Sequence, residues 1–350
     1  MAFVFDESEL EIIGQYRLPG IYGGTAKIVP QFKRPITPKE NLIRYLKREN
    51  PLWMPDMRRD CATICPYVMP DSYARAFGGV DWFGIHWTYE PKANAAMVTP
   101  GTRRLSDITE WEKELIFPDL NAIDWEKDYR DNYSEGLNDS RFTTFVILNG
   151  LFERTADLTS FEDTFCYLLE EPEALTAFYD RLSQWIIELM GIVKRVYHAD
   201  MILFHDDMGS QKDAFFSPEL FRRLMMPQYQ KITKAAHDMG MFIALHSCGN
   251  VGRQVPNFIE SGFDCWEGQN SANDKQALMD LYGGKLFQMT HLIIEPSLSD
   301  EQAIQLIEDT VNGIGKSHSL LPGIMVMGKR EISLEDVFYR YTRTLYAGKG

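Results

Sequence analysis

The sequence predicts an α/β fold: a (β/α)8 TIM barrel with an N-terminal extension and a rim insertion. Two observations lead to this prediction. The 350-residue chain contains eight short apolar runs, and amphipathic helical segments separate most of them. Near-continuous apolar runs are typical of strands buried on both faces, and strands that alternate with helices form parallel sheets. The alternative is an open doubly wound sheet, but no glycine-rich dinucleotide-binding turn follows any of the runs.

We expect one domain over residues 1–350, with residues 1–50 as the N-terminal extension and first helix. Residues 88–140 are rich in Trp, Asp and Pro, which favours a hairpin with short helices inserted over one rim. The apolar runs predict strands at 51–57, 81–87, 142–149, 201–207, 241–248, 264–269, 286–293 and 324–328.

The first predicted helix covers residues 37–48, where Thr37 precedes a proline and then a glutamate in a capping-box arrangement. A long 3.6-residue apolar period predicts a helix over 172–197, and a Ser-Pro-Glu start at Ser217 predicts another over 217–239. The remaining predicted helices follow the later strands, at 251–261, 273–282, 299–315 and 333–346.

Composition excludes several classes of function. The chain has 36 Lys and Arg against 50 Asp and Glu, a formal net charge of −14, so we expect no nucleic-acid binding. No apolar run approaches the ~18 residues of a membrane span, and the acidic N-terminus lacks the basic region of a signal peptide. Five cysteines in a chain of this length favour a reduced, cytoplasmic protein.

In a barrel of this kind the catalytic groups lie where the strands end. The run 241–248 ends in His246 and Cys248, two residues apart and therefore on one face. An imidazole and a thiolate so placed are typical zinc ligands. On the next strand Cys265, Glu267 and Gln269 share a face. We expect Cys265 or Glu267 to be the third ligand; the alternative is a hydrogen-bonded core histidine with apolar filler cysteines.

The run 201–207 ends in His205, Asp206 and Asp207. Three titratable groups that close a hydrophobic strand are costly to bury without partners or a task. Alternation places His205 and Asp207 inward and turns Asp206 away. We expect His205 and Asp207 to handle protons or bind substrate, with Asp206 at the substrate as well; the alternative is that one aspartate caps the next turn or helix.

Further candidates lie at the ends of other strands. Arg58, beside a second arginine, is a candidate for binding a carboxylate or phosphate, because Arg forms bidentate pairs with both; the alternative is a surface ion pair. Glu153 is a candidate catalytic group on the rim. We expect His291, Gln269 and Trp266 to contribute to substrate binding, although aromatic core packing is the common alternative for Trp266.

Two segments carry a resemblance to a known family. Residues 204–232, FHDDMGSQKDAFFSPELFRRLMMPQYQKI, resemble the uroporphyrinogen decarboxylase superfamily, in which an aspartate-rich strand end precedes a Gly-x-Gln turn and a Ser-Pro-Glu helix start. Residues 245–251, LHSCGNV, resemble its zinc-dependent corrinoid methyltransferase branch. The resemblance extends over roughly residues 35–345 and is most specific from 200 to 270.

The resemblance implies a TIM barrel and a zinc-assisted methyltransferase that moves a methyl group between a small O- or N-methylated compound and a corrinoid protein. His246 and Cys248 match the His-x-Cys zinc ligands of that branch. The branch usually takes its third ligand from a late cysteine, but no cysteine follows Cys265 here, which leaves Cys265, Glu267 or another carboxylate, or a site without zinc. The oligomeric state has no signal in the sequence.

Two other functions stay open at this point. The first is a decarboxylase of a carboxylated tetrapyrrole, with Arg58, Arg59 and Asp60 as its site. True decarboxylases carry an Arg-Gln-Ala-Gly-Arg-Tyr segment where this chain has PDMRRDCATICPY, so two arginines are present with different spacing. The second is a non-catalytic barrel that binds a corrinoid or another small ligand.

Overall fold

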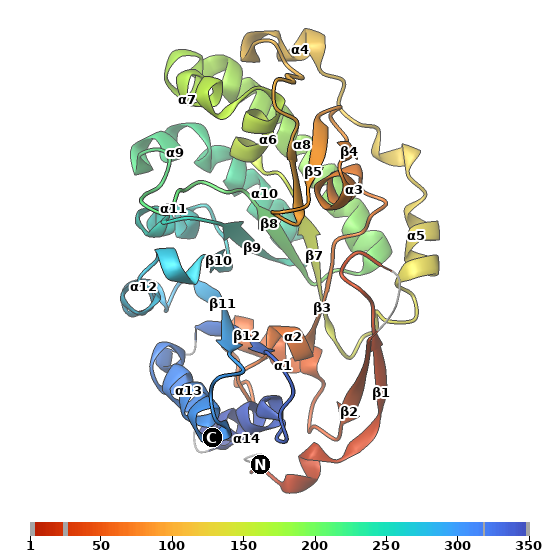
Figure 1. Ribbon diagram of the computed structural model, residues 1–350, viewed down its shortest axis with the longest axis vertical. Coiled ribbons are helices and arrows are strands. Elements are labelled where there is room, and N and C mark those ends of the chain that lie inside the picture. Colours follow the sequence, from red (N-terminus) through yellow and green to blue (C-terminus); the bar gives the residue numbers. More distant parts are fainter. Residues whose placement is uncertain (1–3, 24–26, 318, 348–350) are drawn as a thin grey trace.

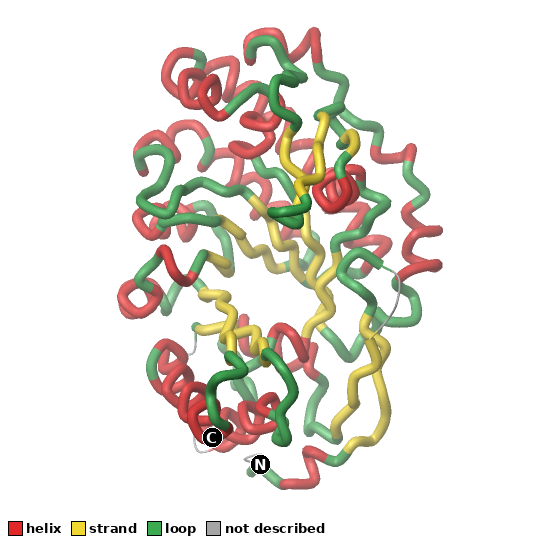
Figure 2. The backbone as a smooth tube through the Cα atoms, viewed as in Figure 1, coloured by secondary structure: helices red, strands yellow, loops and turns green. Residues whose placement is uncertain are grey.

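The computed structural model describes residues 4–23, 27–317 and 319–347. Its centre is a seven-stranded sheet in the order β12-β11-β10-β9-β8-β7-β3, and every strand pair in it is parallel. The strands form a curved arc with helices outside it, which is a TIM-barrel-like arrangement (Figures 1 and 2). The strands are β3 (Cys61–Ile64), β7 (Phe142–Ile147), β8 (Met201–His205), β9 (Phe242–Ser247), β10 (Cys265–Gly268), β11 (Phe287–Ile294) and β12 (Leu320–Val326).

The strand predicted over 51–57 does not form, so a closed ring of eight strands is not confirmed. Pro51 and Pro55 lack the N–H groups that a sheet ladder needs. Beside β12 the chain instead runs through the extended residue Asp56 into the short helix α2 (Met57–Asp60). The N–H of Ile324 in β12 donates to Asp56 Oδ1 at 3.1 Å, so a side-chain carboxylate takes the place of a neighbouring strand.

The strand predicted over 81–87 is also wrong. The Asp81 carboxylate accepts hydrogen bonds from the backbone N–H groups of Phe83 and Ile85, both at 2.9 Å, and folds this segment into a turn. Gly84 makes the turn possible, because its φ of +81° lies in the left-handed region. The turn joins β4 (Gly79–Val80) to β5 (His86–Glu90), and these two strands form a separate antiparallel sheet with β6 (Ala95–Val98).

Most of the predicted helices form close to their expected bounds. In α1 (Pro38–Lys47), Thr37 Oγ1 accepts from the N–H of Glu40 at 3.1 Å, and α8 spans Pro172–Tyr197. The helix predicted over 217–239 divides at Met225 into two, because Pro227 begins a new helix there. The later helices are α9 (Pro218–Leu224), α10 (Met226–Asp238), α11 (Val255–Glu260), α12 (Lys275–Tyr282), α13 (Asp300–Asn312) and α14 (Leu334–Ala347). Among the described helices, none is both long and apolar enough to cross a membrane.

The segment 88–140, predicted as a rim insertion, contains most of a hairpin and then short helices. Strands β5 and β6 form the hairpin, and η2 (Ile108–Glu110), α4 (Trp111–Glu114), η3 (Leu120–Ala122) and α5 (Trp125–Asn132) follow it. The N-terminal extension is a second hairpin, of β1 (Ile12–Leu18) and β2 (Lys27–Phe32). The remaining elements are η1 (Glu7–Leu10), α3 (Pro70–Phe77), α6 (Leu151–Leu158), α7 (Phe161–Glu170), η4 (Gly252–Gln254), η5 (Asn270–Ala272) and η6 (Ile314–Ser317).

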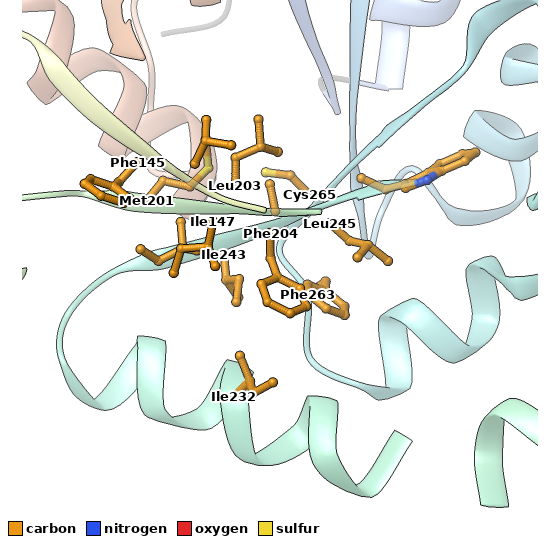
Figure 3. Packing of buried hydrophobic residues seen from close by; sticks show 14 of the residues in the cluster. Phe145, Ile147, Met201, Leu203, Phe204, Ile232, Ile243, Leu245, Phe263 and Cys265 are labelled. Atoms are coloured by element: carbon orange, nitrogen blue, oxygen red, sulfur yellow. The ribbon is translucent and has the colours of Figure 1, made fainter. Parts of the chain in front are cut away.

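The core occupies both faces of the sheet. Leu203 and Cys265 point to one side of the strands, whereas Phe204 and Phe263 point to the other side, where Ile232 of α10 lies (Figure 3). Side chains two residues apart on a strand point to the same face. Residues 205 and 207 therefore lie on the same face as Leu203, and residues 267 and 269 lie on the same face as Cys265. The candidate site residues of these strands therefore lie on the concave side of the curved sheet.

Candidate metal centre

Three titratable side chains lie next to one another at the ends of adjacent strands. His205 ends β8, His246 is near the end of β9 and Glu267 is near the end of β10. The sheet register pairs His205 with His246 and His246 with Glu267. Residues that are paired in register on neighbouring parallel strands point to the same face of the sheet. The three side chains therefore meet on the concave side of the sheet.

Asp207, His246 and Cys248 present three potential metal ligands to one point. Their ligand atoms lie within 4.8 Å of one another, and all three residues are half-buried. Cys248 Sγ is 3.4 Å from His246 Nε2, which is 3.7 Å from Asp207 Oδ1. Tetrahedral zinc with bonds of about 2.0–2.3 Å separates its ligands by about 3.5 Å. These residues fit a zinc site with three protein ligands and a fourth position open.

Glu267 orients His246 and is not the third ligand in this arrangement. Its Oε2 is 2.7 Å from His246 Nδ1, which directs Nε2 toward Cys248 and Asp207. Its Oε1 is 3.5 Å from His291 Nε2. Burial alone would raise the pKa of Glu267, but the hydrogen bonds to His246 and His291 lower it far below its usual value. A carboxylate behind a ligating histidine is the usual support that fixes the ring of a metal ligand.

His205 stacks on His246, with ring centroids 4.1 Å apart and planes inclined by 15°. His205, His246 and Glu267 form a second group whose ligand atoms lie within 4.8 Å. The lone pairs of stacked imidazoles run parallel, so they do not converge on one ion. Burial, and then the neighbouring His246, lower the pKa of His205 well below its usual value, so its ring is neutral at neutral pH. His205 is therefore placed as a neutral proton-exchanging group beside the candidate centre.

The loops after β8 and β9 cross at two glycines, which explains why both segments carry one. A Cβ on Gly249, whose φ is +84°, would come within 2.2 Å of the Gly209 backbone. The N–H of Cys248 donates to Asp207 Oδ1 at 2.7 Å across the same crossing. This contact is what brings Asp207, from the β8 loop, to the two ligands of β9.

Two residues predicted for the site lie elsewhere. Cys265 is fully buried in the core and pairs in register with Ala244, two residues before His246 along β9, so its prediction as a ligand is wrong. Trp266 points to the opposite side, where it packs against Phe258, so its predicted contact with substrate is wrong as well. Buried Lys275 covers the Trp266 ring, with Nζ 4.3 Å from the ring centroid.

Asp206 has the capping role that the sequence left open, and its predicted contact with substrate is wrong. It is fully buried, and its carboxylate accepts from the N–H groups of Phe152 at 3.0 Å and Glu153 at 2.9 Å, in the first turn of α6. The Tyr229 hydroxyl donates to the same carboxylate. Burial, together with the nearby Glu153, raises the pKa of Asp206 to about 7.

We expect Asp206→Ala to lower the free energy of unfolding by about 2–3 kcal/mol, because two backbone N–H groups and a hydroxyl lose their acceptor in a buried place. Tyr229→Phe removes only one of these bonds and is the matched comparison, with an expected loss of about 1 kcal/mol. Urea unfolding followed by circular dichroism measures both. Equal losses in the two variants would contradict the capping role.

Glu153 is buried, and its carboxylate is paired with an arginine. Arg75 of α3 donates to its Oε1 at 3.1 Å, and the same guanidinium lies 3.8 Å from Asp157. Among the described residues, no contact joins Glu153 to His205 or His246. The structure therefore gives Glu153 a part in an ion-pair network and does not support its predicted catalytic role.

Arg58 and His291 come together on the inner side of β12. A Cβ built on Gly323 would be 3.1 Å from His291 Nδ1 and 3.4 Å from Arg58 Cγ. Arg58 is exposed, and no described carboxylate pairs with its guanidinium. Gln269 instead braces the loops, because its Oε1 accepts from Gln211 Nε2 at 2.7 Å and from the N–H of Gly249 at 3.1 Å.

Comparisons with known proteins concern the family resemblance and the fold of this chain. Residues 134–292 match the model of the family described as Uroporphyrinogen decarboxylase (URO-D), which confirms the resemblance predicted from the sequence. The matched region contains all of Asp207, His246, Cys248 and Glu267. No curated protein matches the chain by sequence.

One solved structure is similar over nearly its whole length. A methyltransferase from Methanosarcina mazei aligns with a TM-score of 0.58 and 15% identity, over 90% of this chain and 98% of the other. A sugar phosphate isomerase/epimerase from Parabacteroides distasonis aligns with a TM-score of 0.35 and 10% identity, over 66% of this chain and 78% of the other. At these identities the likeness concerns the fold, and only the first is close enough to carry an argument.

Proposed function

We propose that the protein is a methyltransferase that moves a methyl group from a small O- or N-methylated compound, aromatic ones included, to a corrinoid protein. Zinc held by Asp207, His246 and Cys248 would assist the transfer. The observation that carries the proposal is the convergence of these three ligand types at the ends of β8 and β9. The similarity in fold to a methyltransferase over 98% of that chain supports it.

When bound, zinc would act as a Lewis acid on the heteroatom that loses the methyl group, and the corrinoid would supply the methyl acceptor. The chain's own residues prepare for this. Glu267 holds the His246 ring with Nε2 toward the other ligands. His205, neutral and stacked on His246, keeps a ring N–H that can donate a hydrogen bond to the heteroatom as it loses the methyl group, and solvent would supply the proton that the product takes up. Arg58, beside His291, offers a guanidinium to an anionic group of the substrate.

The geometry favours methyl transfer over decarboxylation of a tetrapyrrole. The decarboxylase alternative requires Arg58, Arg59 and Asp60 to face one substrate. Arg59 donates to Asp336 at 2.7 Å, and Asp60 is buried and accepts from Arg34 at 2.7 Å. Only Arg58 remains available on the inner side, which is too little to hold a molecule with many carboxylates.

The test is methyl transfer to free cobalamin reduced to Co(I), followed by the absorbance of methylcobalamin. Methoxylated aromatic compounds and methylamines are offered as donors to the purified protein. We expect turnover with one of these classes and a loss of about 100-fold or more in Cys248→Ala, since a Lewis acid contributes several kcal/mol. Cys166→Ala changes an exposed cysteine outside the site and should keep full activity.

Two results would contradict the proposal. One is carbon dioxide release from a porphyrinogen that does not depend on metal. The other is methyl transfer at an unchanged rate in Cys248→Ala.

A further inference from the structure

A cavity of about 330 Å³ lies where the strands of the sheet begin, at the edge opposite the candidate metal centre. The N-terminal hairpin, the start of α1 and the residues just before β3 and β7 line it. Asp60 directly precedes β3 and Arg141 directly precedes β7, whereas His205 ends β8. Since these strands are parallel, the cavity and the metal centre lie at opposite ends of the fold.

Arg141 is the feature of this cavity that lacks an explanation. Its side chain is buried, with 3% of the residue exposed, and no carboxylate of the described residues lies within ion-pair distance of it. Its guanidinium donates to the backbone carbonyl of Arg59 and covers the Tyr16 ring at 4.4 Å. Its Nε is buried without a hydrogen-bond partner. A buried guanidinium in this position is a positive charge without a counterion.

The other charged groups of the cavity are already paired. Arg34 donates to Asp60 at 2.7 Å, and Arg59 donates to Asp336 at 2.7 Å. Glu40 accepts from Arg44, outside the cavity lining, at 2.6 Å. The lining thus holds three guanidinium groups, and the acidic residues beside them neutralise two.

Other unused donors belong to residues that line the same cavity. Arg34 Nε and one terminal nitrogen of Arg59 are buried without a hydrogen-bond partner, as is Arg141 Nε. The first turn of α1, which begins after Thr37, lies against the cavity and adds the positive end of a helix dipole. Leaving a buried charge and several donors unsatisfied costs several kcal/mol, which an anionic partner would recover.

We propose that this cavity binds a small oxyanion, a carboxylate or a phosphate, with Arg141 as the principal anchor. Guanidinium groups recognise both anions through two parallel hydrogen bonds. Ile13, Pro30 and Phe32 also line the cavity, so it has room for an apolar body attached to the anion. A bound anion would tie the β1–β2 hairpin to the base of the sheet. The site is separate from the metal centre, so its outcome does not depend on the proposed function.

The test is thermal unfolding of the full-length protein in phosphate, acetate, phenyl phosphate and benzoate, against chloride at equal ionic strength. We expect a saturable rise in Tm of about 2–4 °C for at least one oxyanion. Calorimetric titration with the same anion gives its affinity directly. A rise no greater than that in chloride for all four anions would overturn the proposal, and the ranking separates inorganic phosphate from organic acids.

Two variants locate the binding. Arg141→Gln removes the unpaired charge and should weaken the affinity for the anion by at least about 10-fold. Ile13→Trp places a larger side chain at the exposed edge of the cavity and leaves every arginine of the lining unchanged. It should weaken anion binding to a similar extent. This variant keeps the test decisive if Arg141→Gln does not fold. Arg195→Gln, an exposed arginine of α8, is the control and should leave binding unchanged. Binding unchanged in Ile13→Trp, or in folded Arg141→Gln, would overturn the assignment.

Discussion

In the proposed zinc site, replacing His246 with alanine should weaken zinc binding by more than about 100-fold, so that the purified variant contains almost no zinc. The four protein ligands of typical structural zinc sites share a binding free energy of about 10–16 kcal/mol, so one ligand is worth several kcal/mol, and His246 is central among the three proposed ligands here. Its Nε2 lies within 3.7 Å of Asp207 and its Nδ1 lies 2.7 Å from Glu267. Elemental analysis after gentle purification and competition with a chelating dye measure the loss.

Graded variants make this prediction specific. Glu267→Gln keeps all three ligands but loses the carboxylate behind His246, so we expect a smaller effect of about 10–100-fold. Cys265→Ala removes a buried core thiol and should keep zinc at the wild-type level. Loss of zinc in Cys265→Ala, with retention in an Asp207→Ala variant, would contradict the ligand set and restore the third ligand expected from the sequence.

The sequence predicted which side chains face inward, but not how far along the sheet each one lies relative to the residues of the neighbouring strands. Two-residue spacing placed His205 with Asp207 and His246 with Cys248, and the structure brings all four together. Cys265 and Glu267 share a face in the same way, yet only the register between β9 and β10 decides which of them lies level with His246. That register depends on packing along the whole sheet, which has no local signal.

The proposed third ligand, Asp207, depends on a contact between distant segments. Asp207 reaches the site because Gly209 and Gly249 pass each other closely and the Cys248 N–H bonds its carboxylate. The glycines were visible in the motif, but their contact was not.

Side-chain carboxylates also account for the two strands that do not form. Asp56 bonds the distant Ile324 N–H, which a neighbouring strand would have paired. Asp81, in contrast, bonds the N–H groups of Phe83 and Ile85 in its own turn.

Arg154 connects the rim insertion to the sheet through a buried ion-pair network. The guanidinium is 1% exposed and donates to the carboxylate of Asp71 and, at 2.9 Å, to that of Asp81. Asp81 in turn accepts from the Trp87 indole at 3.2 Å and holds the turn before β5. One guanidinium from α6 therefore pairs with two buried carboxylates of the segment that leads into the insertion.

Arg154→Met should lower the free energy of unfolding by about 3–5 kcal/mol, because it leaves both carboxylates buried without their cation. Arg103→Gln is the control: it breaks an exposed ion pair with Asp163 and should cost no more than about 1 kcal/mol. Denaturant unfolding of the two variants and the wild type gives the difference.

The loss in Arg154→Met should also shrink as the pH falls, and this dependence separates the electrostatic cause from lost packing. Burial raises the pKa of Asp71 to about 6 even beside Arg154, and removing the cation raises it further. A carboxyl with a raised pKa binds its proton more tightly in the folded state, so lowering the pH from 8 toward about 5 stabilises the folded variant relative to the wild type. A loss that stays constant over this range would show that packing, and not the unpaired carboxylates, accounts for it.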